Sequence, residues 1–162
     1  MIKLDKRDLK LLAVLQKDGR IAKADLAKRI NLSSTACWER LKRLEDSGVI
    51  TGYGAHISLS KFAPLSIIFV QVELASHRSS DFTRFEKAVQ NIPEIVECWA
   101  VGGGVDYFLK FACKDIDTYQ CLIDGMLDSD IGLQRYFTYV ATKPVKTSPT
   151  PALDDQLDDT SD

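Results

Sequence analysis

Histidine is scarce in this 162-residue chain, which contains only His56 and His77. Neither histidine accompanies a serine or a cysteine in a spacing typical of a nucleophile and its base. The phosphate-binding pattern GxxxxGK[ST] is absent, and Gly102-Gly103-Gly104 lacks the strand and helix that flank a dinucleotide-binding loop. We therefore expect that the protein is not an enzyme and requires no cofactor.

Long apolar runs are also missing, because no stretch of about 18 apolar residues occurs. The N-terminal residues are too charged for a secretory signal. The four cysteines form no CxxC pair and no metal-like cluster, so we expect reduced cysteines packed as small apolar residues and no bound metal. These absences predict a cytoplasmic protein that does not act at a membrane.

Charge is distributed unevenly along the chain. Residues 1–64 carry 13 Lys and Arg against 7 Asp and Glu, a balance of +6. Residues 65–162 carry 8 against 16, a balance of −8. We call residues 1–64 the basic head. A basic N-terminal part followed by an acidic part indicates that the basic head binds a polyanion such as double-stranded DNA.

Hydrophobic spacing predicts three short helices in the basic head. Asp5 is a capping residue for a helix over 6–17, and a second helix is expected over 23–30, with Asn31 in a left-handed stop position. Ser33 caps a third helix before Gly48. Glycines and strand-forming residues over 49–59 predict a β-hairpin, or wing. The head is therefore interpreted as a winged helix-turn-helix domain over 4–64, with the helix-turn-helix itself over 23–42.

The second half changes to a different pattern, after a linker at 62–64. Strands are expected over 67–74, 95–101, 107–113 and 133–142, and helices after Ser79 and after Asp115 or Asp117. The order β-α-β-β-α-β is the ferredoxin-like arrangement, which makes residues 65–146 a second, α+β domain. Residues 147–162 contain five Asp and no Lys or Arg, and they predict a disordered acidic tail.

The third helix offers a surface that suits DNA. If Cys37, Leu41 and Leu44 point inward, the opposite face is polar and lies where a recognition helix would enter the major groove. The candidate DNA-binding residues on and beside this face are Ser34, Thr35, Trp38, Glu39, Arg40, Lys42 and Arg43. Their hydroxyl, carboxylate and cationic groups suit base edges and phosphates. The alternative is that the face is merely a solvated charged surface.

The string from Leu32 to Ile50, with Leu15-Gln16-Lys17-Asp18-Gly19 before it, resembles the Lrp/AsnC (feast/famine) family of prokaryotic regulators. The resemblance covers about residues 4–146. It departs at Ser34, where the family usually has proline. It implies a nucleoid-associated homo-oligomer, in which sheets pair in dimers that assemble into tetramers, octamers or larger rings.

The resemblance also implies a small-molecule effector, usually an amino acid, bound between dimers at a glycine-containing loop. The candidate effector-binding residues are Val101, Gly102, Gly103, Gly104 and Asp106. Glycine amides suit a carboxylate, and Asp106 suits an ammonium group. Gly104 replaces an acidic residue common in the family, and Trp99 adds a large apolar or cation-binding face nearby. An effector with a different charge pattern, or no effector at all, is therefore an alternative. The alternative is that the glycines form only a hairpin turn, with Asp106 as its cap.

Together these observations predict a sequence-specific DNA-binding transcription regulator that responds to an amino acid or related metabolite. The competing hypothesis is an effector-binding module of metabolism without direct DNA binding.

Overall fold

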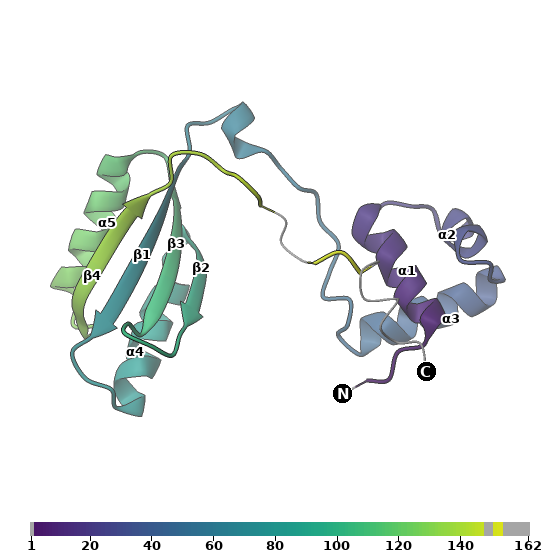
Figure 1. Cartoon of the computed structure of the whole chain (residues 1–162), viewed down its shortest axis with the longest axis horizontal. Helices are drawn as coiled ribbons and strands as arrows, with labels where there is room; N and C mark the ends of the chain where they lie inside the picture. Colours follow the sequence, from purple (N-terminus) through teal and green to yellow (C-terminus); the bar gives the residue numbers. More distant parts are fainter. Residues whose placement is uncertain (1, 148–150, 154–162) are drawn as a thin grey trace. The chain divides into compact units, whose positions relative to one another are not determined.

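The computed structural model describes residues 2–147 and 151–153, and Figure 1 shows the chain. The described residues divide into two compact units: residues 2–56 with 147 and 151–153, and residues 57–146. Residues 148–150 and 154–162 of the predicted acidic tail, which include all five of its Asp residues, lie outside the described residues. Within the part of the chain that the structure describes, no helix is long and apolar enough to cross a membrane.

The first unit begins with α1, Lys6–Lys17. Its bounds and its cap are those predicted from the sequence. The Asp5 side chain accepts hydrogen bonds from the backbone N–H groups of Arg7 and Asp8, while the Asp8 side chain accepts from the Asp5 backbone N–H. This reciprocal capping box satisfies N–H groups that a helix start otherwise leaves unpaired.

Two further helices complete the unit. α2, Lys23–Arg29, ends before Asn31, which has the predicted left-handed conformation with φ of 55°. α3, Ser34–Asp46, begins at Ser33, whose hydroxyl accepts from the Ala36 backbone N–H. The three helices enclose a shared core of Leu11, Leu26, Ala27, Ile30, Cys37, Leu41 and Leu44. The inward stripe predicted for α3 is therefore confirmed.

The β-hairpin predicted over 49–59 is wrong. Residues 51–58 contain no strand, and a single 3₁₀ turn, η1, follows at Leu59–Lys61. Val49 and Ile50 pack against the helical core instead, and the Tyr53 hydroxyl donates to Glu45 of α3 across 2.8 Å. Tyr53 and Ile57 have the residue types of a strand, but among residues 2–147 and 151–153 this stretch has no neighbouring strand with which to pair.

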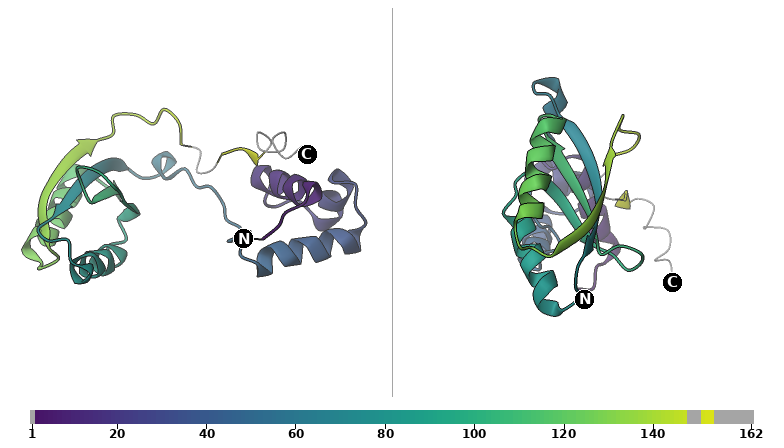
Figure 2. Two further views of the ribbon diagram at one scale, coloured as in Figure 1. Left: turned by 60° about the horizontal axis from the view of Figure 1, so that its bottom comes forward. Right: turned by 90° about the vertical axis from the view of Figure 1, so that its left-hand side faces the viewer.

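Besides η1, the second unit contains one four-stranded antiparallel sheet and two α-helices. These elements are β1 (Ser66–Leu74), α4 (Ser79–Gln90), β2 (Ile95–Ala100), β3 (Tyr107–Cys113), α5 (Ile116–Asp128) and β4 (Leu133–Val140). The spatial order β2-β3-β1-β4, with antiparallel pairing throughout, confirms the ferredoxin-like prediction. Both helices lie on one face of the sheet (Figure 2).

Side chains alternate between the two faces of this sheet because successive residues of a strand point to opposite sides. The helix-covered face carries the buried core, which includes Val70, Leu109 and Phe111 together with Phe85 of α4 and Ile123 of α5. The open face carries five large aromatic residues that are each 40% to 64% exposed. They are Phe69, Trp99, Phe108, Phe137 and Tyr139.

The strand registers place these open-face side chains in adjoining rows. Trp99 lies opposite Phe108, and Phe69 lies opposite Tyr139. Lys110 stands opposite Phe69 on β1 and donates to Glu97 on β2 across 2.6 Å. We refer to this exposed surface as the open sheet face.

Candidate DNA-binding and effector-binding sites

The orientation of α3 is fixed by its apolar stripe. Cys37, Leu41 and Leu44 are no more than 5% exposed, and they lock one side of the helix into the core of the first unit. The opposite side presents the predicted residues Thr35, Glu39 and Lys42 to solvent. Ser34 is exposed in the first helical turn, where a recognition helix usually reaches base edges.

The two arginines on the flank of α3 are engaged within the protein. Arg40 donates to Asp5 across 2.6 Å and to Asp8 across 2.8 Å, and Arg43 also contacts Asp8. Asp8 has no exposed surface, so its negative charge is balanced by these two guanidinium groups. Partnership with the two aspartates raises the pKa of Arg40. Sequence reasoning placed both arginines toward DNA and missed this contact, although the i,i+3 spacing of Asp5 and Asp8 signalled a capping box.

Trp38 is held by a neighbour on α2. The Lys23 ammonium lies 3.6 Å from the centre of the Trp38 ring, which is 44% exposed. A cation over an aromatic ring is attracted by the ring's negative face. This contact joins the two helices of the helix-turn-helix on their solvent side and leaves a cation beside the predicted DNA-binding face.

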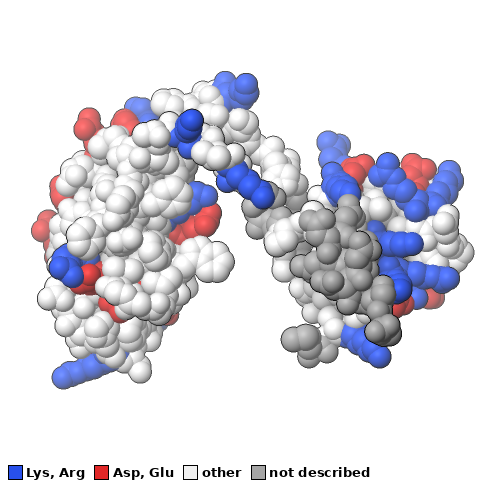
Figure 3. Space-filling view, in the orientation of Figure 1, with Lys and Arg blue, Asp and Glu red and all other residues white. Residues whose placement is uncertain are grey.

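The surface of the first unit is rich in positive charge. Figure 3 shows Lys and Arg side chains gathered on its visible face. The exposed cations on α2 include Lys23, Lys28 and Arg29. Among the ion pairs that the structure shows, the one within α2 joins Lys28 to Asp25 across 3.5 Å. A basic surface around a protruding polar helix has the form that binds phosphate-rich DNA.

In the second unit the glycine segment follows β2, as predicted. Gly102, Gly103 and Gly104 are exposed, and Gly103 has φ of 156°. Val101 closes the loop through its backbone N–H, which donates to the Asp106 carbonyl across 2.9 Å. The loop is thus a tight connection between neighbouring antiparallel strands, with its backbone accessible to a ligand.

Asp106 has intramolecular partners. Its carboxylate accepts from the Leu74 backbone N–H across 2.8 Å and lies 3.0 Å from Nε2 of His77. The side chain is 17% exposed. The structure therefore gives Asp106 a role at the end of β1 that its position in the sequence did not reveal, and it keeps one edge of the carboxylate near solvent.

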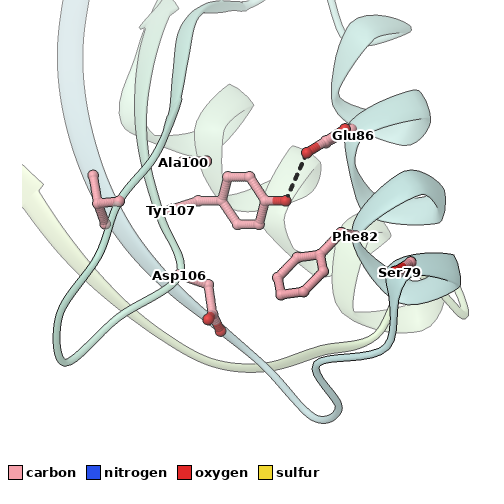
Figure 4. A pocket seen from close by; sticks show the side chains of 7 residues that line it. Ser79, Phe82, Glu86, Ala100, Asp106 and Tyr107 are labelled. Atoms are coloured by element: carbon pink, nitrogen blue, oxygen red, sulfur yellow. Dashed lines mark hydrogen bonds between the residues drawn. The ribbon is translucent and has the colours of Figure 1, made fainter.

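A cavity of about 440 Å³ lies beside this loop. Its lining consists of Ser79, Phe82, Glu86, Ala100, Val101, Asp106 and Tyr107. Of the predicted effector residues, Val101 and Asp106 line the cavity, whereas the three glycines lie outside its lining. Figure 4 shows the Tyr107 hydroxyl pointing to Glu86, to which it donates across 2.9 Å. Burial first, and the contact with Glu86 second, raise the pKa of Tyr107, so the hydroxyl remains a donor.

The residues contributed by α4 were missed from sequence because a helix pattern does not tell which strand it covers. Trp99, expected near the effector, belongs to the open sheet face, since it pairs with Phe108 rather than lining the cavity. Its indole N–H donates to Glu97 across 3.3 Å.

Known protein families match both units. A winged helix-turn-helix DNA-binding model matches residues 4–51. The Lrp/AsnC ligand binding domain model matches residues 67–151. The chain belongs to the Lrp/AsnC family. It is a DNA-binding transcriptional regulator with a ligand-binding domain, which confirms the interpretation of the sequence.

Relatives cover nearly the whole chain. The transcriptional regulatory protein DoeX of Halomonas elongata is 54% identical over 145 residues, which is 90% of this chain and 92% of that protein. The leucine-responsive regulatory protein of Escherichia coli K12 is 39% identical, with 90% and 88% covered. Both relatives are named as regulatory proteins, the first as transcriptional and the second as leucine-responsive.

Solved structures of the Lrp/AsnC family share the fold. A regulator from Agrobacterium tumefaciens superposes with a TM-score of 0.86 at 34% identity, covering 94% of this chain and 99% of that one. A transcriptional regulator from Neisseria meningitidis, solved as a complex with L-methionine, has the same TM-score at 30% identity, with 95% and 99% covered.

Proposed function

We propose that this Lrp/AsnC regulator binds specific operator sequences in cytoplasmic DNA through the outward face of α3. The supporting observation is the division of that helix into a buried apolar stripe and a polar face carrying Thr35, Glu39 and Lys42. Thr35 offers a hydroxyl and a methyl group to base edges, and Glu39 suits cytosine N4. Lys42 suits a phosphate. Ser34 and Trp38 border this face, while Arg40 and Arg43 hold α3 against α1.

We propose further that the protein acts as a homo-oligomer. The open sheet face exposes five aromatic residues in adjoining rows, and exposed apolar surfaces of this kind mark protein interfaces. A second copy of the same sheet is the occupant that the family resemblance implies. Pairing two copies by a two-fold axis would present two α3 helices to DNA, as half-sites about one helical turn apart require.

The effector part of the proposal concerns the loop of residues 101–106 and the cavity beside it. A small molecule, an amino acid or a related metabolite, is proposed to bind there and to shift the assembly between states of different DNA affinity. Two observations support this: the ligand-binding family model spans these residues, and a relative of the same fold was solved with L-methionine.

An electrophoretic mobility shift titration tests the DNA part. The probes are the DNA immediately upstream of the protein's own gene and a shuffled DNA fragment of equal length, each tested at several salt concentrations. We expect tighter binding to the upstream region and a steep loss of affinity with salt, because Lys and Arg contacts release counterions. If the protein shows the same weak affinity for both fragments and this affinity does not change with salt, the result would instead support a module without direct DNA binding.

A further inference from the structure

The cavity beside the 101–106 loop has an unusual balance of charge. Among its seven lining residues two are carboxylates, Glu86 and Asp106, and none is Lys or Arg. Two aromatic rings, Phe82 and Tyr107, form apolar walls, and their centres lie 6.2 Å apart. Aromatic faces attract cations, and so do carboxylates, so the lining favours a positively charged group.

Glu86 is presented to the cavity by α4. Its Oε1 accepts from the Tyr107 hydroxyl across 2.9 Å, which fixes the direction of the side chain (Figure 4). A carboxylate has room for about four hydrogen bonds, so one from Tyr107 does not exhaust its accepting capacity. Tyr107 is itself 2% exposed and packs against Phe85, with ring centres 4.7 Å apart. Glu86 is therefore positioned by a rigid part of the core.

Asp106, which directly precedes β3, contributes a second negative charge to the lining of the cavity. It is positioned by the Leu74 backbone N–H, and the nearby His77 ring stacks on Phe82 with centres 5.9 Å apart. Because His77 already contacts Asp106, we assign the ligand's direct contact to Glu86. Asp106 adds to the negative potential and closes the wall.

We propose that the effector bound in this cavity is a compact organic cation whose ammonium group binds Glu86 against the Phe82 and Tyr107 rings. The inference rests on the effector part of the proposed function and specifies the ligand class. An α-amino acid with a second ammonium group on its side chain meets this requirement, because its carboxylate can extend out of the cavity toward the exposed glycine amides of the adjoining loop. A neutral amino acid has only its α-ammonium group to offer the two carboxylates of the lining, so one of them would keep no counter-charge.

Matched ligands test the inference by isothermal titration calorimetry and thermal shift on the full chain. L-Ornithine and L-norvaline share the same carbon skeleton and differ in the terminal ammonium group, and L-glutamate supplies the opposite charge. We expect L-ornithine to bind about tenfold or more tightly than L-norvaline, as a charge-assisted hydrogen bond provides. L-Glutamate should produce no shift.

Two variants locate the contact. Glu86→Gln retains an acceptor for the Tyr107 hydroxyl but removes the negative charge. The affinity of this variant for L-ornithine should therefore fall to its affinity for L-norvaline. Asp128→Asn, which removes an exposed charge from α5 outside the cavity, should leave L-ornithine binding unchanged. An unchanged L-ornithine affinity in Glu86→Gln would overturn the inference.

The outcomes separate this inference from the function beneath it. Binding of L-norvaline as tightly as L-ornithine overturns the cation preference and leaves an effector site standing. Binding of none of the three ligands overturns the inference as well. In either case the mobility shift titration without ligand still decides whether the protein binds DNA.

Discussion

The guanidinium of Arg40 donates to the carboxylate of Asp8 across 2.8 Å, and Asp8 has no exposed surface. Asp8 also closes the capping box of α1. One buried carboxylate thus helps to cap the start of α1 and holds α3, the candidate DNA-binding helix, in place. The arrangement gives α3 a fixed orientation before it meets DNA, which reduces the entropy lost on binding.

Asp8→Ala should therefore destabilise the first unit markedly. Removing the carboxylate takes from Arg43 its contact with Asp8, leaves Arg40 with Asp5 alone and breaks the capping box, a combined cost of roughly 2–4 kcal/mol. Urea unfolding followed by circular dichroism measures the loss. Asp25→Ala is the control, because its pair with Lys28 is exposed and should contribute less than about 1 kcal/mol. Equal losses in the two variants would refute the structural role of Asp8.

Lys42→Ala should weaken DNA binding with the fold intact. Lys42 is exposed on the outward face of α3, so we expect similar losses on specific and nonspecific DNA, and a salt dependence reduced by about one counterion. Arg43→Ala is the comparison: it should lower stability as well, because Arg43 contacts Asp8. Salt titrations and thermal unfolding of both variants separate the roles. An unchanged salt slope for Lys42→Ala would place DNA on another face.

Helix positions and their caps were predictable from the sequence because their causes are local. Asp5, Asn31 and Ser33 act on backbone groups within a few residues, and all three have the predicted conformation or bond. The strand order followed from the order of the elements. What could not be predicted depends on contacts between residues distant in the sequence.

Three residues illustrate this limit. A helical wheel places Arg43 on a flank but cannot show that Asp8, 35 residues earlier, lies beside it. Trp99 is close to the glycine loop in sequence, yet strand alternation directs it to the open sheet face. Glu86 lines the cavity only because α4 crosses this end of the sheet. The predicted wing over 49–59 was wrong for a related reason, because a β-strand forms only where a second strand lies beside it to accept and donate backbone hydrogen bonds.

Ser33→Ala should cost the first unit about 1 kcal/mol, the usual contribution of a side-chain N-cap. The Ser33 hydroxyl accepts from the Ala36 backbone N–H across 3.2 Å, and alanine offers no acceptor. For a unit of this size the midpoint of thermal unfolding should fall by about 4–8 °C. Ser34→Ala, one residue into the helix, serves as the control and should leave the midpoint nearly unchanged. A larger effect of Ser34→Ala would contradict the assigned cap.

Asp115 should contribute to the acid sensitivity of the second unit. Its carboxylate accepts from the hydroxyl and the backbone N–H of Thr118, and these bonds lower its pKa. A lowered folded-state pKa means that the contribution is present above the unfolded value of about 4 and is lost as the pH falls through the folded value. Asp115→Asn keeps a capping acceptor without a titrating group. Its unfolding free energy should fall less steeply below about pH 4 than that of the unmodified protein, as urea unfolding across pH measures.

Phe137→Glu should shift the protein toward smaller assemblies. Phe137 is 43% exposed on the open sheet face, where a buried glutamate would oppose association. Leu127→Glu is the matched control, since Leu127 is equally exposed on α5, on the other side of the sheet. Size-exclusion chromatography with light scattering reports the mass of each variant. If Leu127→Glu dissociates the protein and Phe137→Glu does not, the interface lies on the helix side.

Tyr107 and Phe108 are adjacent on β3, and their side chains lie on opposite faces of the sheet. Tyr107 lines the cavity proposed for the effector, and Phe108 lies on the open sheet face. A single peptide unit thus separates the proposed ligand contact from the proposed subunit contact. If occupation of the cavity favours one assembly, thermodynamic reciprocity requires that assembly alter the affinity for the ligand by the same factor. The apparent effector affinity would then depend on protein concentration, and the cellular abundance of the regulator would set its sensitivity.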